Sequence, residues 1–275
     1  MNILDGKVAL VSGSGRGIGK AIALKLASAG AHVVVNDLDE DVANATASEI
    51  ESLGVRAVVC VGDVTDADFG DKFVGAAVAH FGTIDIIVNN AGYAWDSVLQ
   101  KTSDEQWMAM LDVHLNAPFR ILRAAQPVIA AAAKKETAEH GRATRRTVIN
   151  ISSVAGLGGN AGQSGYAAGK AGIVGLTKTV MKEWGRHNVT VNAVAFGAIM
   201  TRMTAGEAGS TTISVKGRDI KAGVSDEILE AMEKGIPLGR AGTPEEAAGA
   251  VYLLCLPEAD YITGEVIVAG GGWKL

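Results

Sequence analysis

The chain is predicted to fold as a single α/β domain, built on a doubly wound parallel sheet of seven strands with helices on both faces. Short β-branched runs alternate with longer helical patterns along the sequence. The strand-like runs are nearly all apolar, as expected of parallel strands covered on both faces. No linker-like stretch or internal repeat interrupts the 275 residues, so we expect one domain over residues 1–275.

The predicted strands are short and rich in Val and Ile, and the segments between them combine helical periodicity with strong helix formers. In chain order the strands are expected at 7–12, 32–36, 55–61, 84–90, 146–152, 189–195 and 265–270. The helices are expected at 17–29, 40–53, 66–80, 104–133, 166–185 and 244–255. Right-handed crossovers would place these helices on both sides of the sheet.

Two segments depart from this alternation. Residues 130–146 are expected to lead from an Ala-rich helix end into a charged, basic loop before the fifth strand. Residues 203–235 form a long excursion after the sixth strand. Open α/β sheets bind ligands at the carboxyl ends of their strands, and a long loop there is usually functional. We therefore predict a substrate lid at 203–235.

Composition and charge exclude several classes of protein. Hydrophobic residues make up 48% of the chain and charged residues 20%, which is typical of a soluble globular protein. A net charge of −5 argues against nucleic acid as a partner, and no apolar run is long enough to span a membrane. Cys60 and Cys255 are the only cysteines, and no metal-ligand spacing occurs. A cytoplasmic protein without a metal site is expected.

The first turn predicts a nucleotide site. The stretch "SGSGRGIG" follows the first strand and opens a helix. Glycines at this place let the backbone approach a pyrophosphate, and the helix N-terminus supplies N–H donors. The predicted contacts are Gly13, Arg16, Gly17, Ile18 and Gly19.

Asp37 and Leu38 follow the second strand directly, and Asp37 lies about twenty residues after the glycines. A carboxylate there can accept hydrogen bonds from ribose hydroxyls and would repel a 2′-phosphate, which favours NAD over NADP. Alternatively Asp37 caps the next helix, although Asp39 can fill that role. Arg16 leaves NADP open, because a cation near the turn could bind a 2′-phosphate.

Five motifs in order resemble the short-chain dehydrogenase/reductase family over essentially the whole chain. They are "SGSGRGIG", "GDV" at 62–64, "NNAG" at 89–92, "ISS" at 151–153 and "YAAGK" at 166–170. The resemblance implies a Rossmann-like fold and hydride transfer between a nicotinamide and a carbonyl or secondary alcohol. It places Asp63 and Val64 beside the adenine, and Asn90, Ala91 and Gly92 along the cofactor ribose.

The pair Tyr166 and Lys170 answers a chemical need of that reaction. Reducing a ketone requires a proton on oxygen, and an unperturbed phenol with a pKa near 10 is a poor donor at neutral pH. Residues four apart share a helix face, so the Lys170 ammonium is expected to lower the pKa of Tyr166. By resemblance, Lys170 also binds the nicotinamide ribose and Ser153, preferred over Ser152, holds the substrate oxygen.

Two positions depart from the family pattern. His114 stands where many members carry an Asn that helps to hold a relay water, so it joins the candidate catalytic residues. A packing role is favoured for His114 over a proton shuttle, with the water held by main chain. Phe196 replaces the usual proline, which predicts an altered loop. Gly197 and Thr201 still match, so Gly197, Ile199 and Thr201 are expected to lie at the nicotinamide.

The substrate prediction also depends on resemblance. The stretches "NAGQSGYAAGKAGIVGLTK" and "IPLGRAGTPEEAA" resemble 3-oxoacyl-[acyl-carrier-protein] reductases and 3-hydroxyacyl-CoA dehydrogenases. An acyl thioester on coenzyme A or acyl carrier protein is therefore expected. The family's carrier-binding arginine aligns best with His187, and Arg142, Arg145 and Arg146 could supply that charge instead. A solvated basic loop is the favoured explanation of these three arginines.

Alternative functions remain open at this point. One is an NAD-dependent dehydrogenase of another secondary alcohol, such as a steroid, cyclic alcohol or polyol. Another is a nucleotide-binding protein without turnover. The apolar end "YITGEVIVAGGGWKL" resembles the tail that packs between subunits in this family, so a homotetramer is expected.

Overall fold

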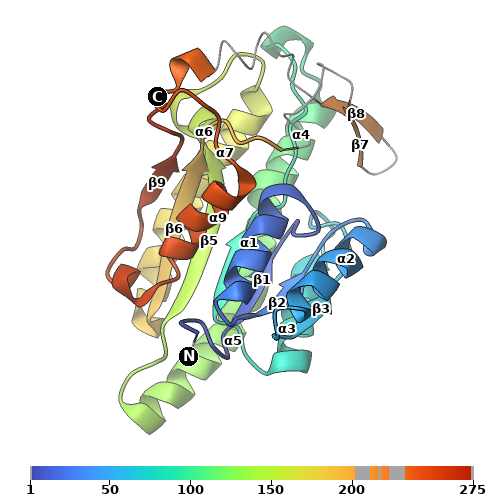
Figure 1. Ribbon diagram of the computed structural model, residues 1–275. Helices are drawn as coiled ribbons and strands as arrows, with labels where there is room; N and C mark the ends of the chain where they lie inside the picture. The colour runs from blue at the N-terminus through green and yellow to red at the C-terminus, as the bar shows by residue number, and fades with distance from the viewer. Residues whose placement is uncertain (1, 202–210, 216–217, 223–232, 274–275) are drawn as a thin grey trace.

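A seven-stranded parallel sheet forms the centre of the computed structural model, which describes residues 2–201, 211–215, 218–222 and 233–273 (Figure 1). Its strands are β1 (Val8–Val11), β2 (His32–Val35), β3 (Ala57–Val59), β4 (Ile86–Asn89), β5 (Arg146–Ser153), β6 (Val189–Phe196) and β9 (Val266–Ala269). They lie in the order β3-β2-β1-β4-β5-β6-β9, and every neighbouring pair is parallel. The strand order reverses between β1 and β4, where such sheets open a ligand crevice. The predicted fold class is confirmed.

Helices cover both faces of the sheet, as the crossovers require (Figure 1). One layer contains α1 (Gly17–Ser28), α2 (Glu40–Glu51) and α9 (Pro244–Leu253). The other contains α3 (Phe69–Phe81), α5 (Ala117–His140) and α7 (Ser164–Trp184), with α4 (Asp104–Leu111) packed on α7. Short helical turns complete the connections: η1 (Leu99–Lys101), α6 (Val154–Gly158), η3 (Gly185–His187) and η4 (Pro257–Ala259).

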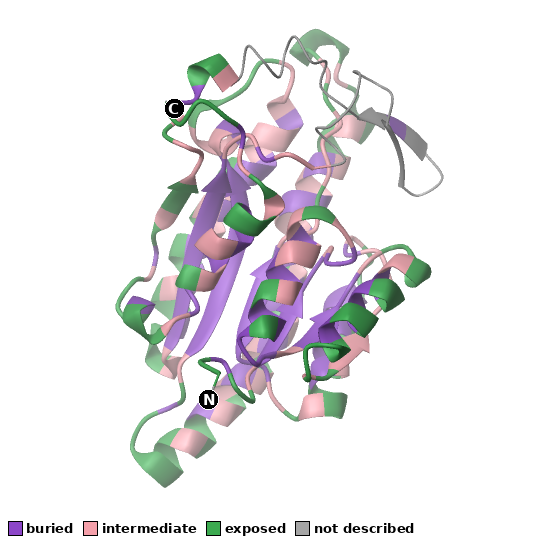
Figure 2. Cartoon of the chain, viewed as in Figure 1, coloured by how far each residue is buried: buried purple, intermediate pink, exposed green. Residues whose placement is uncertain are grey.

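The central strands supply the hydrophobic core. Every residue of β5 and of β6 is buried, and Figure 2 shows the strands buried beneath helices whose outer faces are exposed. Val and Ile on one side of the sheet pack against α1, α2 and α9, and those on the other pack against α3, α5 and α7. Two apolar layers of this kind explain why the strand sequences are nearly uniform in hydrophobicity.

The helix expected at 104–133 is wrong in two respects. A π-helical turn, η2 (Asp112–Asn116), separates α4 from α5. Helix α5 then continues to His140, because the residues after Ala133 are mostly strong helix formers, and it ends where Gly141 adopts a left-handed φ of 80°. The loop expected before β5 is therefore reduced to residues 141–145.

The predicted lid segment, 203–235, lies largely outside the described residues. Within it, β7 (Thr211–Val215) and β8 (Arg218–Ala222) form an antiparallel pair separate from the main sheet. The sequence prediction missed this pair, although the β-branched run "TTISV" followed by Lys-Gly is a recognisable hairpin signal. Among the described helices, none combines the length and apolar character needed to cross a membrane.

Candidate active site

The predicted site residues meet at one edge of the sheet, where the parallel strands end. Each follows a carboxyl end of a strand or lies on a helix packed beside it. Gly13, Arg16, Gly17, Ile18 and Gly19 follow β1; Asp37 and Leu38 follow β2; Asp63 and Val64 follow β3; Asn90, Ala91 and Gly92 follow β4; Ser153 ends β5; Gly197, Ile199 and Thr201 follow β6; His114 lies in η2; and Tyr166 and Lys170 lie on α7. Residues dispersed over the sequence thus form one edge, as a cofactor site requires.

The glycine turn after β1 fits a pyrophosphate. Gly13 and Gly17 have φ of 61° and 56°, values that favour glycine. A Cβ on Gly19 would collide with the carbonyl of Gly13 and the amide of Asn90. Helix α1 begins at Gly17 without a side-chain cap or an acidic residue in its first turn. Its first N–H groups are therefore not taken by a side chain, which suits an anion.

Polar side chains from neighbouring strands hold this turn; the sequence prediction overlooked Ser12 and Asn36, and it gave Asn90 only a place along the cofactor ribose. The Gly13 N–H donates to Oδ1 of Asn36 at 3.0 Å. The Asn90 amide donates to the carbonyls of Ser12 at 2.9 Å and Gly13 at 3.1 Å. Ser12 Oγ in turn accepts from the Asn90 and Ala91 N–H groups. The Asn90 side chain therefore positions the turn, and polar residues at the ends of apolar strands were the available signal.

Two carboxylates surround the guanidinium of Arg16. It lies 3.1 Å from Asp39 and 3.7 Å from Asp37. Asp39 caps α2 by accepting from the Val42 N–H, so Asp37 is released from the capping role. The Asp37 side chain is only 13% exposed and lies close to Gly15, where a Cβ would approach Oδ2 to 2.6 Å. Arg16 carries one positive charge and the two carboxylates carry two negative charges, so this part of the site has a net negative charge.

The predicted catalytic side chains lie together on β5 and α7. Ser153 Oγ accepts from the Ala155 N–H at 3.2 Å and hydrogen-bonds the Tyr166 hydroxyl. The Lys170 Nζ donates to the Ile151 carbonyl at 2.8 Å and lies 5.7 Å from the centre of the Tyr166 ring. Ser152 donates to the Lys170 carbonyl at 2.7 Å, which occupies it in fastening α7 to β5. This geometry explains why Ser153, not Ser152, is available at the site.

Burial controls the ionisation of Tyr166 and Lys170, and the expected direction of the Tyr166 pKa shift is wrong. Burial raises the pKa of Tyr166, which its hydrogen bond with Ser153 opposes, and the Asp96 carboxylate raises it further. Burial lowers the pKa of Lys170 from 10.5 to about 7. The Lys170 ammonium was expected to lower the Tyr166 pKa, but Lys170 Nζ donates to the Ile151 carbonyl and desolvation of the phenol dominates.

His114 is enclosed between the loop after β4 and α7. The ring is 3% exposed, and Nε2 lies 2.8 Å from the Tyr93 carbonyl, so Nε2 carries the proton. The ring meets Tyr166 edge to face with centres 4.8 Å apart. Burial, followed by the positive charge of Lys170, holds the His114 pKa well below its usual value. A neutral, hydrogen-bonded ring supports the packing interpretation over the shuttle.

The segment after β6 keeps its place despite the missing proline. Phe196 is buried and pairs with Ser153 and Ala269 as the last residue of β6. A Cβ on Gly197 would lie 2.7 Å from the Gly270 backbone, so glycine permits a close crossing. Ile199 then pairs with Gly242. Phe196 therefore extends β6 by one residue beyond the predicted strand at 189–195, and the loop begins at Gly197.

The three arginines considered for carrier binding lie at the opposite edge of the sheet. Arg145 donates to the carbonyls of Leu254 and Leu256 and pairs with Asp260 at 3.0 Å. Arg146 begins β5, is buried, and donates to both carboxylate oxygens of Glu136. Arg142 donates to the Asn188 side chain. The sequence suggested two roles for Arg145 and Arg146, carrier binding and a place in a solvated loop. Both predictions were wrong, because these arginines stabilise the amino ends of the strands.

This fold and this site define a nucleotide-binding oxidoreductase of the Rossmann type, with a glycine turn for the dinucleotide and a Ser-Tyr-Lys group beside it. A family model described as Enoyl-(Acyl carrier protein) reductase matches residues 13–274. The chain belongs to the short-chain dehydrogenase/reductase family, whose members are NAD(P)-dependent oxidoreductases.

Similar sequences and structures cover nearly the whole chain. It is 36% identical over 273 residues to 3-oxoacyl-[acyl-carrier-protein] reductase FabG of Chlamydia muridarum, with 98% of each chain covered. It is 39% identical over 274 residues to 3-oxoacyl-[acyl-carrier-protein] reductase of a Synechocystis species, covering 99% of this chain and 98% of the relative.

Two solved structures superpose along the full length. A protein described as a short-chain alcohol dehydrogenase from Sinorhizobium meliloti gives a TM-score of 0.84 at 32% identity, with 98% of each chain covered. A blue fluorescent protein from a metagenomic library, in complex with NADPH, gives 0.83 at 27% identity and covers 99% of this chain and 100% of its own.

Proposed function

We propose that this protein transfers a hydride between NAD(H) and the 3-carbon of a 3-oxoacyl or 3-hydroxyacyl thioester. The observation that carries the proposal is the hydrogen-bonded pair Ser153 and Tyr166, with Lys170 one helical turn further on, at the sheet edge that bears the glycine turn. The names of the curated relatives supply the substrate class.

Each residue of the site would have its own role in the reduction of the substrate. A bound nicotinamide nucleotide supplies the hydride. Ser153 and the Tyr166 hydroxyl hold the substrate oxygen, and Tyr166 donates the proton that turns it into a hydroxyl. Lys170, with a pKa of about 7, can hold or release a proton at neutral pH and so restore the phenol. Ser153 and Lys170 are buried and Tyr166 is partly buried, which makes each hydrogen bond stronger than it would be in water.

The cofactor would lie along the sheet edge. The first turn of α1, with Gly13, Gly17, Ile18 and Gly19, would hold the pyrophosphate. Asp37 and Leu38 would lie at the adenosine ribose. Asp63 and Val64 would flank the adenine, Asn90, Ala91 and Gly92 the ribose, and Gly197, Ile199 and Thr201 the nicotinamide amide.

We infer that NAD(H) is preferred to NADP(H). A 2′-phosphate near Asp37 would meet two carboxylates and a single guanidinium, since Arg16 is already shared by Asp37 and Asp39. These three side chains together would repel the doubly charged 2′-phosphate, which favours NAD(H), the cofactor that lacks this phosphate. The blue fluorescent relative was solved with NADPH, so the two cofactors need direct comparison.

The test measures turnover of a short 3-oxoacyl thioester by the purified protein, with NADH and NADPH in parallel. A 2-enoyl thioester is the control, because the matching family model is described as an enoyl reductase. We expect oxidation of NADH with the 3-oxoacyl thioester and none with the enoyl thioester, since the Ser-Tyr pair is arranged to protonate an oxygen. Turnover of the enoyl thioester alone would overturn the proposal. Oxidation of cyclic alcohols or polyols by NAD⁺, with no turnover of the thioester, would support the alternative that the protein is a dehydrogenase of another secondary alcohol.

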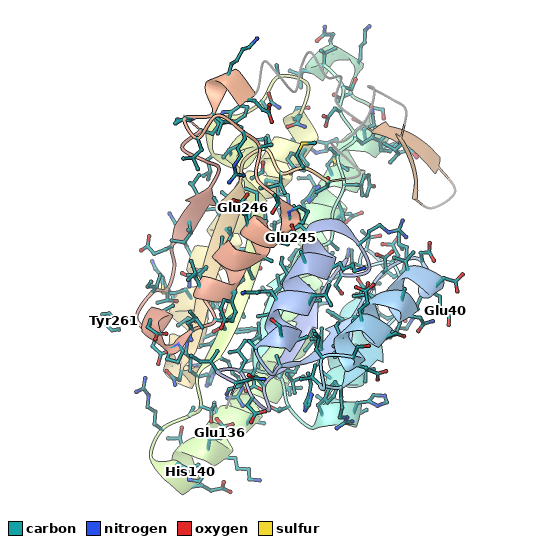
Figure 3. The ribbon with its side chains drawn as sticks, viewed as in Figure 1. Glu40, Glu136, His140, Glu245, Glu246 and Tyr261 are labelled. Atoms are coloured by element: carbon teal, nitrogen blue, oxygen red, sulfur yellow. The ribbon has the colours of Figure 1, made fainter. Side chains whose placement is uncertain are left out.

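The proposed assembly is a homotetramer in the cytoplasm. Apolar side chains are exposed along the edge formed by β9 and the turn before it: Tyr261, Ile262, Ile267 and Val268. Tyr261 is fully exposed and points away from the fold in Figure 3. A second copy would cover this edge strand. Both cysteines are free thiols, which fits a reducing compartment. Light scattering on a sizing column tests the assembly, and a monomer would refute it.

A further inference from the structure

The π-helical turn η2 (Asp112–Asn116) lies between two loops that form the cofactor edge. Helix α7 approaches it closely, because a Cβ on Gly169 would lie 2.9 Å from His114 Cβ and one on Gly172 would lie 2.8 Å from the Leu115 side chain. Helix α3 approaches the following turn in the same way, since a Cβ on Gly70 would meet the Arg120 backbone at 2.7 Å. Glycines therefore let α7 approach η2 closely and let α3 approach the start of α5 closely.

One contact runs from η2 to the loop after β4. His114 Nε2 donates to the Tyr93 carbonyl at 2.8 Å. The edge of the imidazole lies directly against Gly92, where a Cβ would collide with Cε1 and lie 2.8 Å from Nδ1. His114 therefore supports the Asn90–Tyr93 segment from the inner side, while Gly92 remains exposed at the surface of the site.

A second contact runs from the same region to the loop after β3. Arg120 donates through Nη1 to the Thr65 carbonyl at 3.0 Å, and its Nη2 lies 3.7 Å from Oδ1 of Asp112. The Asn116 amide donates to the same Asp112 oxygen at 2.7 Å. Thr65 itself donates twice to the Asp63 carboxylate, through N–H at 2.8 Å and Oγ1 at 2.7 Å. A chain of polar contacts therefore joins η2 to Asp63.

We propose that His114 on η2 and Arg120 at the start of α5 are positioning residues, which brace the two halves of the cofactor site separately. Arg120 holds the loop of Asp63 and Val64, which would meet the adenine, and His114 holds the loop of Asn90 to Gly92, which would meet the nicotinamide ribose. The inference rests on the cofactor placement of the proposed function. π-helical turns are often retained at functional sites, and here the turn carries His114, while Arg120 on the first turn of α5 is linked to it through Asp112.

Binding of two ligands distinguishes an effect on the adenine half of the cofactor site from an effect on the nicotinamide half. AMP occupies the adenine half alone, whereas NADH occupies both halves. Dissociation constants are measured by titration calorimetry without substrate, so the result does not depend on which compound the enzyme reduces. Wild-type protein that failed to bind NADH would refute the proposed function, whereas wild-type binding followed by unchanged variants would refute only the bracing roles.

The variants retain the bulk of each side chain: His114→Phe removes the hydrogen bond to Tyr93, and Arg120→Met removes both the hydrogen bond to Thr65 and the ion pair with Asp112. Arg120→Met keeps the aliphatic stem and loses the donor to Thr65, and Arg123→Met is its control, because Arg123 lies on the same helix over Phe119. His114→Phe keeps the ring and loses the donor to Tyr93. His114→Gln restores an N–H donor and should recover most of the lost affinity.

Arg120→Met should weaken AMP and NADH alike, by about five- to tenfold, the effect of losing one charge-assisted hydrogen bond that holds the adenine loop. His114→Phe should weaken NADH by a similar factor and leave AMP within about twofold. Equal weakening of AMP and NADH by His114→Phe would indicate general destabilisation and overturn its role. Unchanged affinities in Arg120→Met would overturn the role of Arg120.

Discussion

Replacing Lys170 by Met should make the ligand-free protein more stable while it abolishes turnover. The buried ammonium has a pKa of about 7 in the fold against 10.5 ordinarily. Each pKa unit corresponds to about 1.4 kcal/mol, so keeping this group charged opposes folding by about 4 to 5 kcal/mol. Loss of the hydrogen bond to the Ile151 carbonyl removes about 1 kcal/mol. The expected net gain in the free energy of unfolding is about 3 to 4 kcal/mol at pH 6.

The pH dependence identifies the cause of this gain. Between pH 7 and 10.5 the unfolded lysine is protonated and the folded one is not, so wild-type stability rises with pH over that range. The advantage of Lys170→Met is therefore complete below pH 7 and declines as the pH approaches 10.5.

Urea unfolding of both proteins from pH 6 to 10, followed by circular dichroism, measures this difference. Lys178→Met is the matched control, because Lys178 is exposed on the same helix, and it should change stability by less than about 0.5 kcal/mol at every pH. A Lys170→Met protein that is less stable at pH 6, or a gain that does not vary with pH, would refute the reasoning.

Three further outcomes are expected. Tyr166→Phe should keep cofactor affinity and reduce kcat by a factor on the order of a hundred or more, measured by steady-state kinetics, because the proton donor is lost; near wild-type turnover would contradict its role. Asp37→Ala should narrow the preference for NADH over NADPH about tenfold or more in parallel titrations, because one of two repelling carboxylates is removed; an NADPH preference in the wild type would reverse the assignment. Gly19→Ala should weaken NADH binding and lower stability by roughly 2 kcal/mol or more, because its Cβ would collide with the Gly13 carbonyl. Gly175→Ala, in open space on α7, serves as control and should be neutral or stabilising in thermal unfolding.

The sheet and most of its helices could be predicted because one physical pattern determined them. A strand covered on both faces must be apolar throughout, and β5 and β6 show this in sequence and in burial alike. The end of α5 could not be placed, since charged residues such as those near His140 suit an exposed helix as well as a loop. The break at η2 was also missed, because it depends on packing against glycines of α7 that are distant in sequence.

Local motifs predicted which residues gather at the site but not their electrostatic state. The spacing of Tyr166 and Lys170 placed both on one helix face, as expected. Spacing carries no information on burial, so the sequence predicted a lowered pKa for Tyr166, whereas burial raises it. Likewise, the charge of Arg145 and Arg146 was visible in the sequence, whereas their partners Asp260 and Glu136 could be found only in the fold.

The far end of α5 offers a point of attachment for placing the enzyme on a surface. At 1.5 Å per residue its 24 residues span about 36 Å, and Figure 3 shows Glu136 and His140 at the end away from the carboxyl edge of the sheet. Burial raises the pKa of the Cys255 thiol to about 12 and raises that of Cys60, so both native thiols react slowly with maleimides at neutral pH. A single exposed thiol introduced by His140→Cys would tether each molecule in the same orientation, with its nucleotide edge facing the solution.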